Sequence, residues 1–177
     1  MFFVSPSQVN FQIPPGTATG PATVRAMTQA GTGFLGSTLI SNTAPGLFSA
    51  NGNGQGPAAA VALRVLANGA QLFEPVVRFD AAQNRFVAVP IDLGPEGDQV
   101  FLVLFGTGFR FRSTLGNVSV TLGGTDAQVT LAGAQGDLIG VDQLNVRVPR
   151  SLAGRGEVEV ALTVDSKSAN KVMVIFK

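Results

Sequence analysis

The chain contains part of itself twice, and this repeat limits what it can fold into more than any other feature. Residues 7–27 read SQVNFQIPPGTATGPATVRAM, and residues 142–161 read DQLNVRVPRSLAGRGEVEVA. The identical positions are Gln8, Asn10, Pro14, Gly20 and Val24 in the first copy and Gln143, Asn145, Pro149, Gly154 and Val158 in the second. Each copy alternates apolar and polar residues, crosses a Pro- and Gly-rich turn and alternates again. This pattern predicts a β-hairpin-like piece of a larger module.

The two copies differ in what precedes them. About 45 residues with a strand pattern come before the second copy, whereas the first copy begins almost at Met1. Two explanations remain open: the leading strands lie on sequence ahead of Met1, or the strands at 58–92 replace them. We favour the second, and predict a monomer in which residues 58–92 pair with the N-terminal strands. A strand-exchanged dimer is the alternative, since unpaired edges invite strand addition.

Alternation with a period of two runs through most of the chain, and 22 Gly and 10 Pro supply turns. The sequence predicts an all-β protein. The expected strands cover 8–13, 22–28, 34–40, 58–66, 71–79, 85–92, 99–105, 117–122, 126–132, 142–148, 156–164 and 171–176. Asn68-Gly69 is a strong two-residue hairpin signal, and residues 80–84 predict a second, longer hairpin loop.

A turn cluster at residues 93–98 (LGPEGD) suggests a domain boundary. We expect an N-terminal β-sandwich over 1–93, incomplete at its front and including the hairpin block 58–92. A second sandwich follows over 94–177, with the size and strand spacing of an immunoglobulin-like domain. The fragment 97–177 should therefore fold alone. Residues 44–57 have the composition of a flexible loop.

Composition excludes several classes of function. The chain has no Cys and no His, which removes thiolate and imidazole metal ligands, Cys nucleophiles and the usual His base, so we expect no enzyme, no cofactor and no metal centre. A net charge of +1 without a basic run gives no reason to expect nucleic acid. No segment has the length of apolar sequence that inserts in a membrane. The first residues lack the basic region of a signal peptide, so a signal would lie on sequence not present here.

Two glycine-rich motifs suggest phosphate or calcium loops, and each has a simpler interpretation. Residues 31–36 match G-x-G-x-x-G, but β-branched residues and a Pro-Gly break follow where a dinucleotide-binding fold needs a helix. We interpret them as a turn between strands. Residues 51–56 (NGNGQG) lack the alternating carboxylates of a calcium loop, and we interpret them as a plain loop.

Four amides and three carboxylates are the other candidate site residues. Asp92, Glu96 and Asp98 lie across one turn, and could bind calcium weakly or simply be solvated; Asp92 and Glu96 as a glycosidase pair is the least supported option. Gln8, Asn10, Gln143 and Asn145 recur in both copies. We expect them to be structural, with side-chain bonds to a neighbouring loop, and keep a shared ligand site as the alternative.

All 13 aromatic residues are Phe, with no Tyr or Trp. Sugar-binding sites favour rings with a hydrogen-bonding tip, so this composition counts against a stacking-based carbohydrate site. Most of the Phe residues fall in or beside expected strands, and we expect those to be core: Phe11, Phe73, Phe79, Phe86, Phe101, Phe105, Phe109 and Phe176.

Several long blocks resemble known families. Residues 100–110 (VFLVLFGTGFR) and 118–164 resemble an immunoglobulin-like domain of the IPT/TIG type, with the turn at 106–109 and the strand at 142–149 in the expected places. More closely, residues 4–24, 42–48, 89–110 and 140–165 resemble an uncharacterised C-terminal domain family on large secreted proteins of soil Acidobacteria. This resemblance implies two tandem Ig-like β-sandwiches, the second IPT/TIG-like and the first without its usual leading strands. It brings no catalytic residues.

The resemblance implies an extracellular or cell-surface location and attachment to upstream modules of the same polypeptide or to other surface proteins. We therefore expect a non-enzymatic structural or adhesion module of a bacterial protein. The alternative is an extracellular module that binds polysaccharide through loops at one end of a sandwich. IPT/TIG-like domains also occur in DNA-binding proteins, but the near-zero net charge argues against that role.

Overall fold

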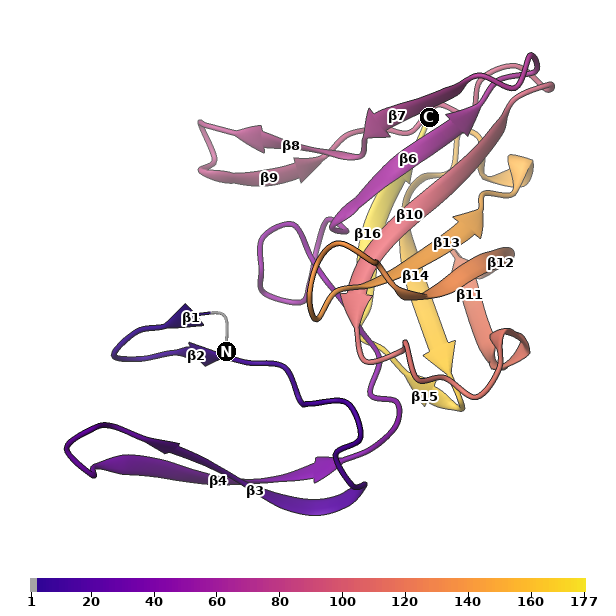
Figure 1. Ribbon diagram of the computed structural model, residues 1–177. Helices are drawn as coiled ribbons and strands as arrows, with labels where there is room; N and C mark the ends of the chain where they lie inside the picture. The colour runs from indigo at the N-terminus through magenta and orange to yellow at the C-terminus, as the bar shows by residue number, and fades with distance from the viewer. Residues whose placement is uncertain (1–2) are drawn as a thin grey trace. The chain divides into compact units, whose positions relative to one another are not determined.

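The computed structural model describes residues 3–177 as an all-β chain with two short 3₁₀ turns, η1 (Leu115–Asn117) and η2 (Arg150–Leu152). It divides into two compact units, which we call the N-terminal unit (Met1–Asn42) and the C-terminal unit (Thr43–Lys177) (Figure 1). Each is described by itself. The all-β prediction is confirmed. Within the described residues, no helix is long and apolar enough to cross a membrane.

One sheet of the C-terminal unit is built around β10 (Gln99–Thr107), which pairs antiparallel with β6 (Ala60–Val65) on one edge and with β13 (Asp142–Arg147) on the other. β7 (Gln71–Pro75) extends the sheet beyond β6, across the predicted Asn68-Gly69 turn. The short β5 (Gly46–Leu47) pairs with the end of β10. In Figure 1, β6, β10 and β13 run side by side across the unit.

A second layer is centred on β14 (Gly156–Val164). Its strand partners are β11 (Val118–Leu122), β15 (Lys167–Ser168) and β16 (Val172–Phe176), all antiparallel. The long β12 (Thr125–Ala134) joins the layers, because its first residues pair with β11 and its later residues pair with β13 across an irregularity between Val129 and Leu131. The result is a sandwich-like unit in which one strand belongs to both sheets.

The core fills the space between these layers with one face of each alternating strand. Leu102 and Leu104 of β10 and Leu144 of β13 are fully buried. They pack in one continuous cluster with Val160 and Leu162 of β14. A strand presents every second residue to one side, so the period-two pattern of the sequence becomes this apolar face.

The N-terminal unit consists of two hairpins. The first pairs β1 (Phe3–Val4) with β2 (Val9–Asn10), and the second pairs β3 (Gly20–Met27) with β4 (Gly33–Ile40) over eight residue pairs. The expected strand at 8–13 is therefore mostly missing. Pro14 and Pro15 follow it directly and cannot donate backbone hydrogen bonds, which limits its extension.

The strands of each repeat copy do not pair with one another among the described residues, so the hairpin-like interpretation is wrong. In the second copy β13 pairs with β10 and β12, whereas β14 pairs with β11, β15 and β16. In the first copy β2 pairs with β1, and β3 pairs with β4. The repeat unit is a connection that carries the chain from one sheet to another, because its Pro-rich turn separates the strands.

The strands at 58–92 do not complete an N-terminal sandwich as we expected. β6 and β7 join β10 instead, and the hairpin of β8 (Val77–Asp80) and β9 (Arg85–Ala88) follows them. The division between compact units accordingly falls after Asn42, whereas the turn cluster had suggested a boundary between residues 93 and 94. A fragment 97–177 would lack Leu47, Ala62 and Ile91 of the core, so it is not the unit we expect to fold alone.

The expectation that most Phe residues are core is only partly correct. Phe109 and Phe176 are buried, and Phe101 and Phe105 are half-buried. Phe11, Phe73, Phe79 and Phe86 are exposed, and the last two stack edge to face across the β8–β9 hairpin with ring centroids 5.4 Å apart. Short hairpins and edge strands have a second face that no layer covers, which alternation alone does not reveal.

Candidate functional site

The most buried charged group of the C-terminal unit is a carboxylate that fixes a turn. Asp142 is 0% exposed and lies at the start of β13. Its Oδ2 accepts hydrogen bonds from the backbone N–H groups of Phe109 (2.8 Å) and Arg110 (3.0 Å), and its Oδ1 accepts one from the Arg110 guanidinium. A buried charge is stable only when it is paired and hydrogen-bonded. Asp142 thus ties the turn after β10 to the start of β13.

The same turn is held from the other side by the segment before β5. The backbone N–H of Ala44 donates to the carbonyl oxygen of Gly108 over 2.8 Å. Gly108 has a φ of +80°, and a Cβ atom there would lie 2.0 Å from the Ala44 carbonyl oxygen. Only glycine fits this close approach without strain. The Gly106–Phe109 motif is therefore explained by packing.

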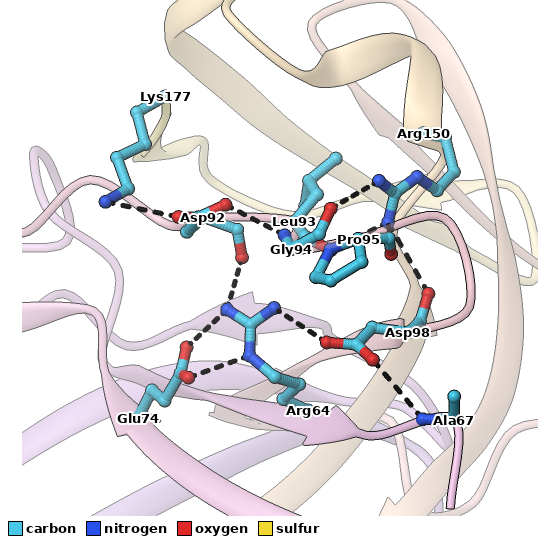
Figure 2. Close-up of polar contacts among 10 residues, drawn as sticks. All are labelled: Arg64, Ala67, Glu74, Asp92, Leu93, Gly94, Pro95, Asp98, Arg150 and Lys177. Atoms are coloured by element: carbon cyan, nitrogen blue, oxygen red, sulfur yellow. Dashed lines mark hydrogen bonds and ion pairs between the residues drawn. The ribbon is translucent and has the colours of Figure 1, made fainter.

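Figure 2 shows a second group of charges around Arg64, whose side chain points inward from β6. Its guanidinium donates to both carboxylate oxygens of Glu74 on β7, at 2.8 and 3.0 Å, and to the carbonyl oxygen of Asp92 at 2.6 Å. The Asp98 carboxylate lies 3.6 Å away. The bond to Glu74 is the main cause that raises the pKa of Arg64 above its usual value, and the charges of Asp92 and Asp98 add to it.

Arg150 of η2 approaches the same turn from its other side (Figure 2). Its guanidinium donates to the carbonyl oxygens of Leu93 (2.7 Å), Gly94 (2.6 Å) and Pro95 (3.0 Å). These carbonyls have no strand partner, and the forked guanidinium satisfies several of them at once. Two arginines from distant parts of the chain therefore fix the turn between residues 92 and 98.

The three carboxylates considered for calcium are placed by these contacts. Asp92 accepts from the Gly94 N–H and pairs with Lys177 Nζ at 3.2 Å, and the Gly94 bond is the first cause that lowers its pKa. Asp98 is buried against Arg64, and Glu96 is exposed. An open hollow of about 500 Å³ beside them is also lined by Glu74 and Lys177. Asp92 and Asp98 already face cations of the protein, so they favour a structural role.

A second open hollow, of about 520 Å³, lies beside the β14–β15 turn, and we call it the polar hollow because most of its lining residues are polar. It is lined by Ser113, Gly116, Asn117, Ser119, Thr163, Asp165 and Ser166. Ser113 Oγ donates to Asp165 Oδ1 over 2.5 Å, and this bond is the main cause that lowers the pKa of Asp165. The hollow thus presents an ionised carboxylate surrounded by hydroxyl and amide groups, which can exchange hydrogen bonds with a polyol.

The β14–β15 turn at this hollow has an unusual backbone. Asp165 and Ser166 have φ angles of +47° and +65°, a region that glycine occupies most easily. They form a two-residue turn between Val164 and Lys167, which are paired. Such turns normally carry Asn-Gly or Asp-Gly. Ser166 occupies the turn position where glycine is usual, and it lines the hollow.

The repeated amides bond to each other and not to a neighbouring loop. Gln143 Nε2 donates to Asn145 Oδ1 over 2.9 Å, and Gln8 Nε2 donates to Asn10 Oδ1 over 2.7 Å. The pair is half-buried in the second copy and exposed in the first. The expected bonds to loop backbone are therefore replaced by a bond along the strand, between two residues on the same face.

Both glycine-rich motifs are turns or loops, as interpreted from the sequence. Residues 31–36 form the tip of the β3–β4 hairpin and the start of β4, with the Gly31 N–H bonded to the Thr28 carbonyl. Residues 51–56 form a loop in which Asn53 Oδ1 accepts from Ser49 Oγ and from the Gln55 N–H. Across residues 3–177, no three Asp, Glu, His or Cys side chains gather closely enough to hold a metal ion.

Sequence reasoning missed the two arginine contacts and the Asp142 contacts. The sequence did contain a signal for Arg64, because this charged residue lies on the same strand face as Ala60 and Ala62, which point to the core.

Comparison with known protein families, with curated proteins and with solved structures finds no match to this chain.

Proposed function

We propose that the chain is a non-enzymatic structural and adhesion module of a secreted or cell-surface bacterial protein, built from Ig-like strands of the IPT/TIG type. The observation that carries this proposal is the exposed apolar side of the N-terminal unit. Val9, Phe11 and Ile13 are 41%, 47% and 40% exposed. Exposed apolar side chains at alternate positions are available for contact with another macromolecule.

The C-terminal unit supports the structural part of the proposal. Among the described residues, the buried charged side chains are Arg64, Asp98 and Asp142, and each pairs with an opposite charge and holds a loop or turn. Catalytic groups, in contrast, need to reach a substrate with a proton or an electron pair. Buried charges that fix loops and turns fit a structural role better than a catalytic one.

A flow-chamber experiment tests adhesion. Beads coated with the full chain are allowed to settle on immobilised bacterial envelope material, and the wall shear stress that detaches them is measured. We expect coated beads to resist more shear than bare beads, and Phe11→Asp to remove most of this difference. Phe73→Asp is the matched control, because Phe73 is an exposed strand residue of the C-terminal unit. Equal detachment of coated and bare beads would refute the proposal.

The second candidate function is polysaccharide binding at the polar hollow. The strained Asp165-Ser166 turn and the surrounding hydroxyl groups favour it, since backbone strain often accompanies functional sites. A panel of soluble bacterial and plant polysaccharides tests it. Saturable micromolar binding that Asp165→Asn weakens at least about tenfold would support this function. Absence of saturable binding favours the structural role.

A further inference from the structure

One arginine of the C-terminal unit has no partner among the described residues. Arg112 follows the turn after β10 and is half-buried. Its Nε atom is buried, and no acceptor of the described chain bonds to it. The buried guanidinium of Arg64 pairs with Glu74, and the half-buried one of Arg110 pairs with Asp142. The ion pairs of the described residues do not include Arg112.

This environment is unfavourable for a charged side chain. Burial removes water from part of the guanidinium, and charges that lose water are normally paired. A buried N–H without an acceptor also loses its bond to water and gains none in return. The apolar stem of an arginine can pack against the protein, but an uncharged side chain would do so without this cost. The charge of Arg112 is therefore suited to an anion from outside the chain.

Arg112 lies over the outward face of the first sheet. Its Nη1 atom is 3.5 Å from the position that a Cβ atom on Gly133 would occupy. Gly133 of β12 pairs with Gln143 of β13. The neighbouring pair, Ala132 and Leu144, is buried in the core. Successive pairs of a ladder point to opposite faces, so Gly133 and Gln143 point away from the core, and the guanidinium lies beside Gln143.

The repeated amides add polar groups to this outward face. Gln143 Nε2 donates to Asn145 Oδ1 over 2.9 Å. This bond leaves a carbonyl oxygen on Gln143 and an NH₂ group on Asn145 for other partners. An acceptor and a donor side by side match hydroxyl groups, which both accept and donate. Leu131, the partner of Asn145 on β12, is 39% exposed and adds apolar surface.

The charges around the amides favour an anion over a cation. β10 contains no charged residue, and the charged residues of β13 are the buried Asp142 and the exposed Arg147. Arg147 alternates with the same set as Gln143 and Asn145, so it lies on their face of the sheet. This face of β10 and β13 therefore carries a cation and no carboxylate.

A sugar acid combines the two chemistries that this face matches. A planar guanidinium binds a carboxylate through two parallel hydrogen bonds, and the hydroxyl groups of the sugar suit the amides. An ion pair does not require an aromatic ring, so the absence of Tyr and Trp does not count against such a site. The polar hollow differs, because its lining includes the carboxylate of Asp165 and no Lys or Arg.

We infer that the outward face of β12 and β13 binds sugar acids: the Arg112 guanidinium pairs with the carboxylate of a uronate unit, and the Gln143 and Asn145 amides bind its hydroxyl groups. This inference goes beyond both proposed functions. It adds to the C-terminal unit a binding site that prefers acidic sugars, whereas the carboxylate of the polar hollow would repel them.

The test uses the full chain and a short oligogalacturonate, with isothermal titration calorimetry at low ionic strength. We expect saturable binding, which Arg112→Gln should weaken at least about tenfold because it removes both the charge and the forked donors. Binding should also weaken as salt is added. The methyl ester of the same oligomer keeps the sugar hydroxyls without the charge, and it should not bind.

Two further variants serve as controls. Arg155→Gln removes an exposed arginine of the same unit that also forms no ion pair among the described residues, and it should bind like the original chain. Asp165→Asn changes the polar hollow and should likewise leave oligogalacturonate binding unchanged. Arg112→Gln should have a urea midpoint equal to or above that of the original chain, because it removes an unpaired charge.

Three results would overturn the inference. The first is the absence of saturable binding, or binding that Arg112→Gln leaves undiminished. The second is binding of dextran sulfate as tight as that of oligogalacturonate, because the face would then attract polyanions in general. The third is a marked fall in the urea midpoint of Arg112→Gln, since Arg112 would then serve to hold the fold together.

Discussion

The two copies of the repeat have the same alternation and opposite environments. In β13 the residues Leu144 and Val146 lie in the core, whereas in the first copy Val9 and Phe11 face outward. The Gln–Asn bond is formed in both copies. The comparison shows that alternation determines which residues share a face, while long-range partners determine whether that face is buried.

One position separates the copies chemically. Asp142, which holds the turn at 108–110, aligns with Ser7 in the first copy. Ser7 is exposed, and its N–H lies 3.4 Å from the hydroxyl oxygen of Ser5. The first copy therefore has the strand pattern of the second without the buried carboxylate that joins it to a neighbouring turn.

The largest expected effect comes from dividing the chain. A fragment 43–177 should be soluble and unfold in a single cooperative transition, because it contains the whole core cluster. A fragment 97–177 lacks β5, β6 and β7 and exposes one edge of β10, so it should unfold broadly or aggregate. Urea unfolding of both fragments, followed by circular dichroism, shows which of them unfolds cooperatively. A cooperative melt of 97–177 equal to that of 43–177 would restore the boundary suggested by the sequence.

Next in size is the loss of the buried carboxylate. Asp142→Ala should lower the free energy of unfolding of the C-terminal unit by about 3–5 kcal/mol, because it leaves the Arg110 side chain and two backbone N–H groups without their partner. Ser7→Ala, at the aligned position, is the control and should change it by less than about 0.5 kcal/mol. The measurement is the urea midpoint. Similar effects from both substitutions would mean that Asp142 is not the residue that distinguishes the copies.

Aligned core positions should respond unequally. Leu144→Ala removes a fully buried side chain and should destabilise the C-terminal unit by about 2–4 kcal/mol. Val9→Ala, at the matching position, should cost less than about 0.5 kcal/mol in the absence of a partner strand. Equal costs of the two substitutions would show that the first copy is already covered.

A smaller effect is expected at the repeated amides. Asn145→Ala should cost about 1 kcal/mol, since it breaks the half-buried bond to Gln143. Asn10→Ala breaks the exposed equivalent and should be close to neutral. Thermal melts of the two variants suffice. A stable Asn145→Ala protein with altered ligand binding would instead support a shared ligand site.

The smallest effect concerns pH. The Ser113 hydroxyl and N–H hold the pKa of Asp165 below its usual 3.8, so the folded state binds this proton more weakly than the unfolded state. The stabilisation is complete above the unfolded pKa and is lost as pH falls through the folded one. Asp165→Asn keeps a residue suited to a positive φ, and it should have a lower free energy of unfolding than the original chain at neutral pH. This difference in the free energy of unfolding should shrink at about pH 3. A constant difference between neutral and acid conditions would contradict this.

The strands themselves were predictable from local pattern. Twelve runs were expected, and eleven of them coincide with strands of more than two residues; the run at 71–79 divides into β7 and β8 around Val76. The Asn68-Gly69 pair and the loop at residues 80–84, which lies between two apolar runs, also located their hairpins correctly. These features depend on neighbours in sequence, which is why alternation and turn chemistry reveal them.

The partners that each strand and turn contacts were not predictable from the sequence. β6 alternates Ala60, Ala62 and Arg64 toward the core, but nothing in that pattern says that its partner is β10. The turn at 93–98 looked like a boundary because it is rich in Gly and Pro. Its carbonyl groups are instead bound by Arg150, 57 residues beyond Leu93. Contacts of that separation carry no local signal.

The Asn170 side chain has a consequence for the order in which the molecule can form. Its amide bonds both backbone groups of Leu47 and the carbonyl oxygen of Gly54, and Met173 pairs with Pro57. Residues 47, 54 and 57 therefore take some of their partners from Asn170 and Met173. On a ribosome that adds about 5–20 residues per second, these contacts wait until residue 173 has been made. Until then the loop at residues 47–57 lacks them, and it is more open to aggregation and proteolysis than in the finished unit.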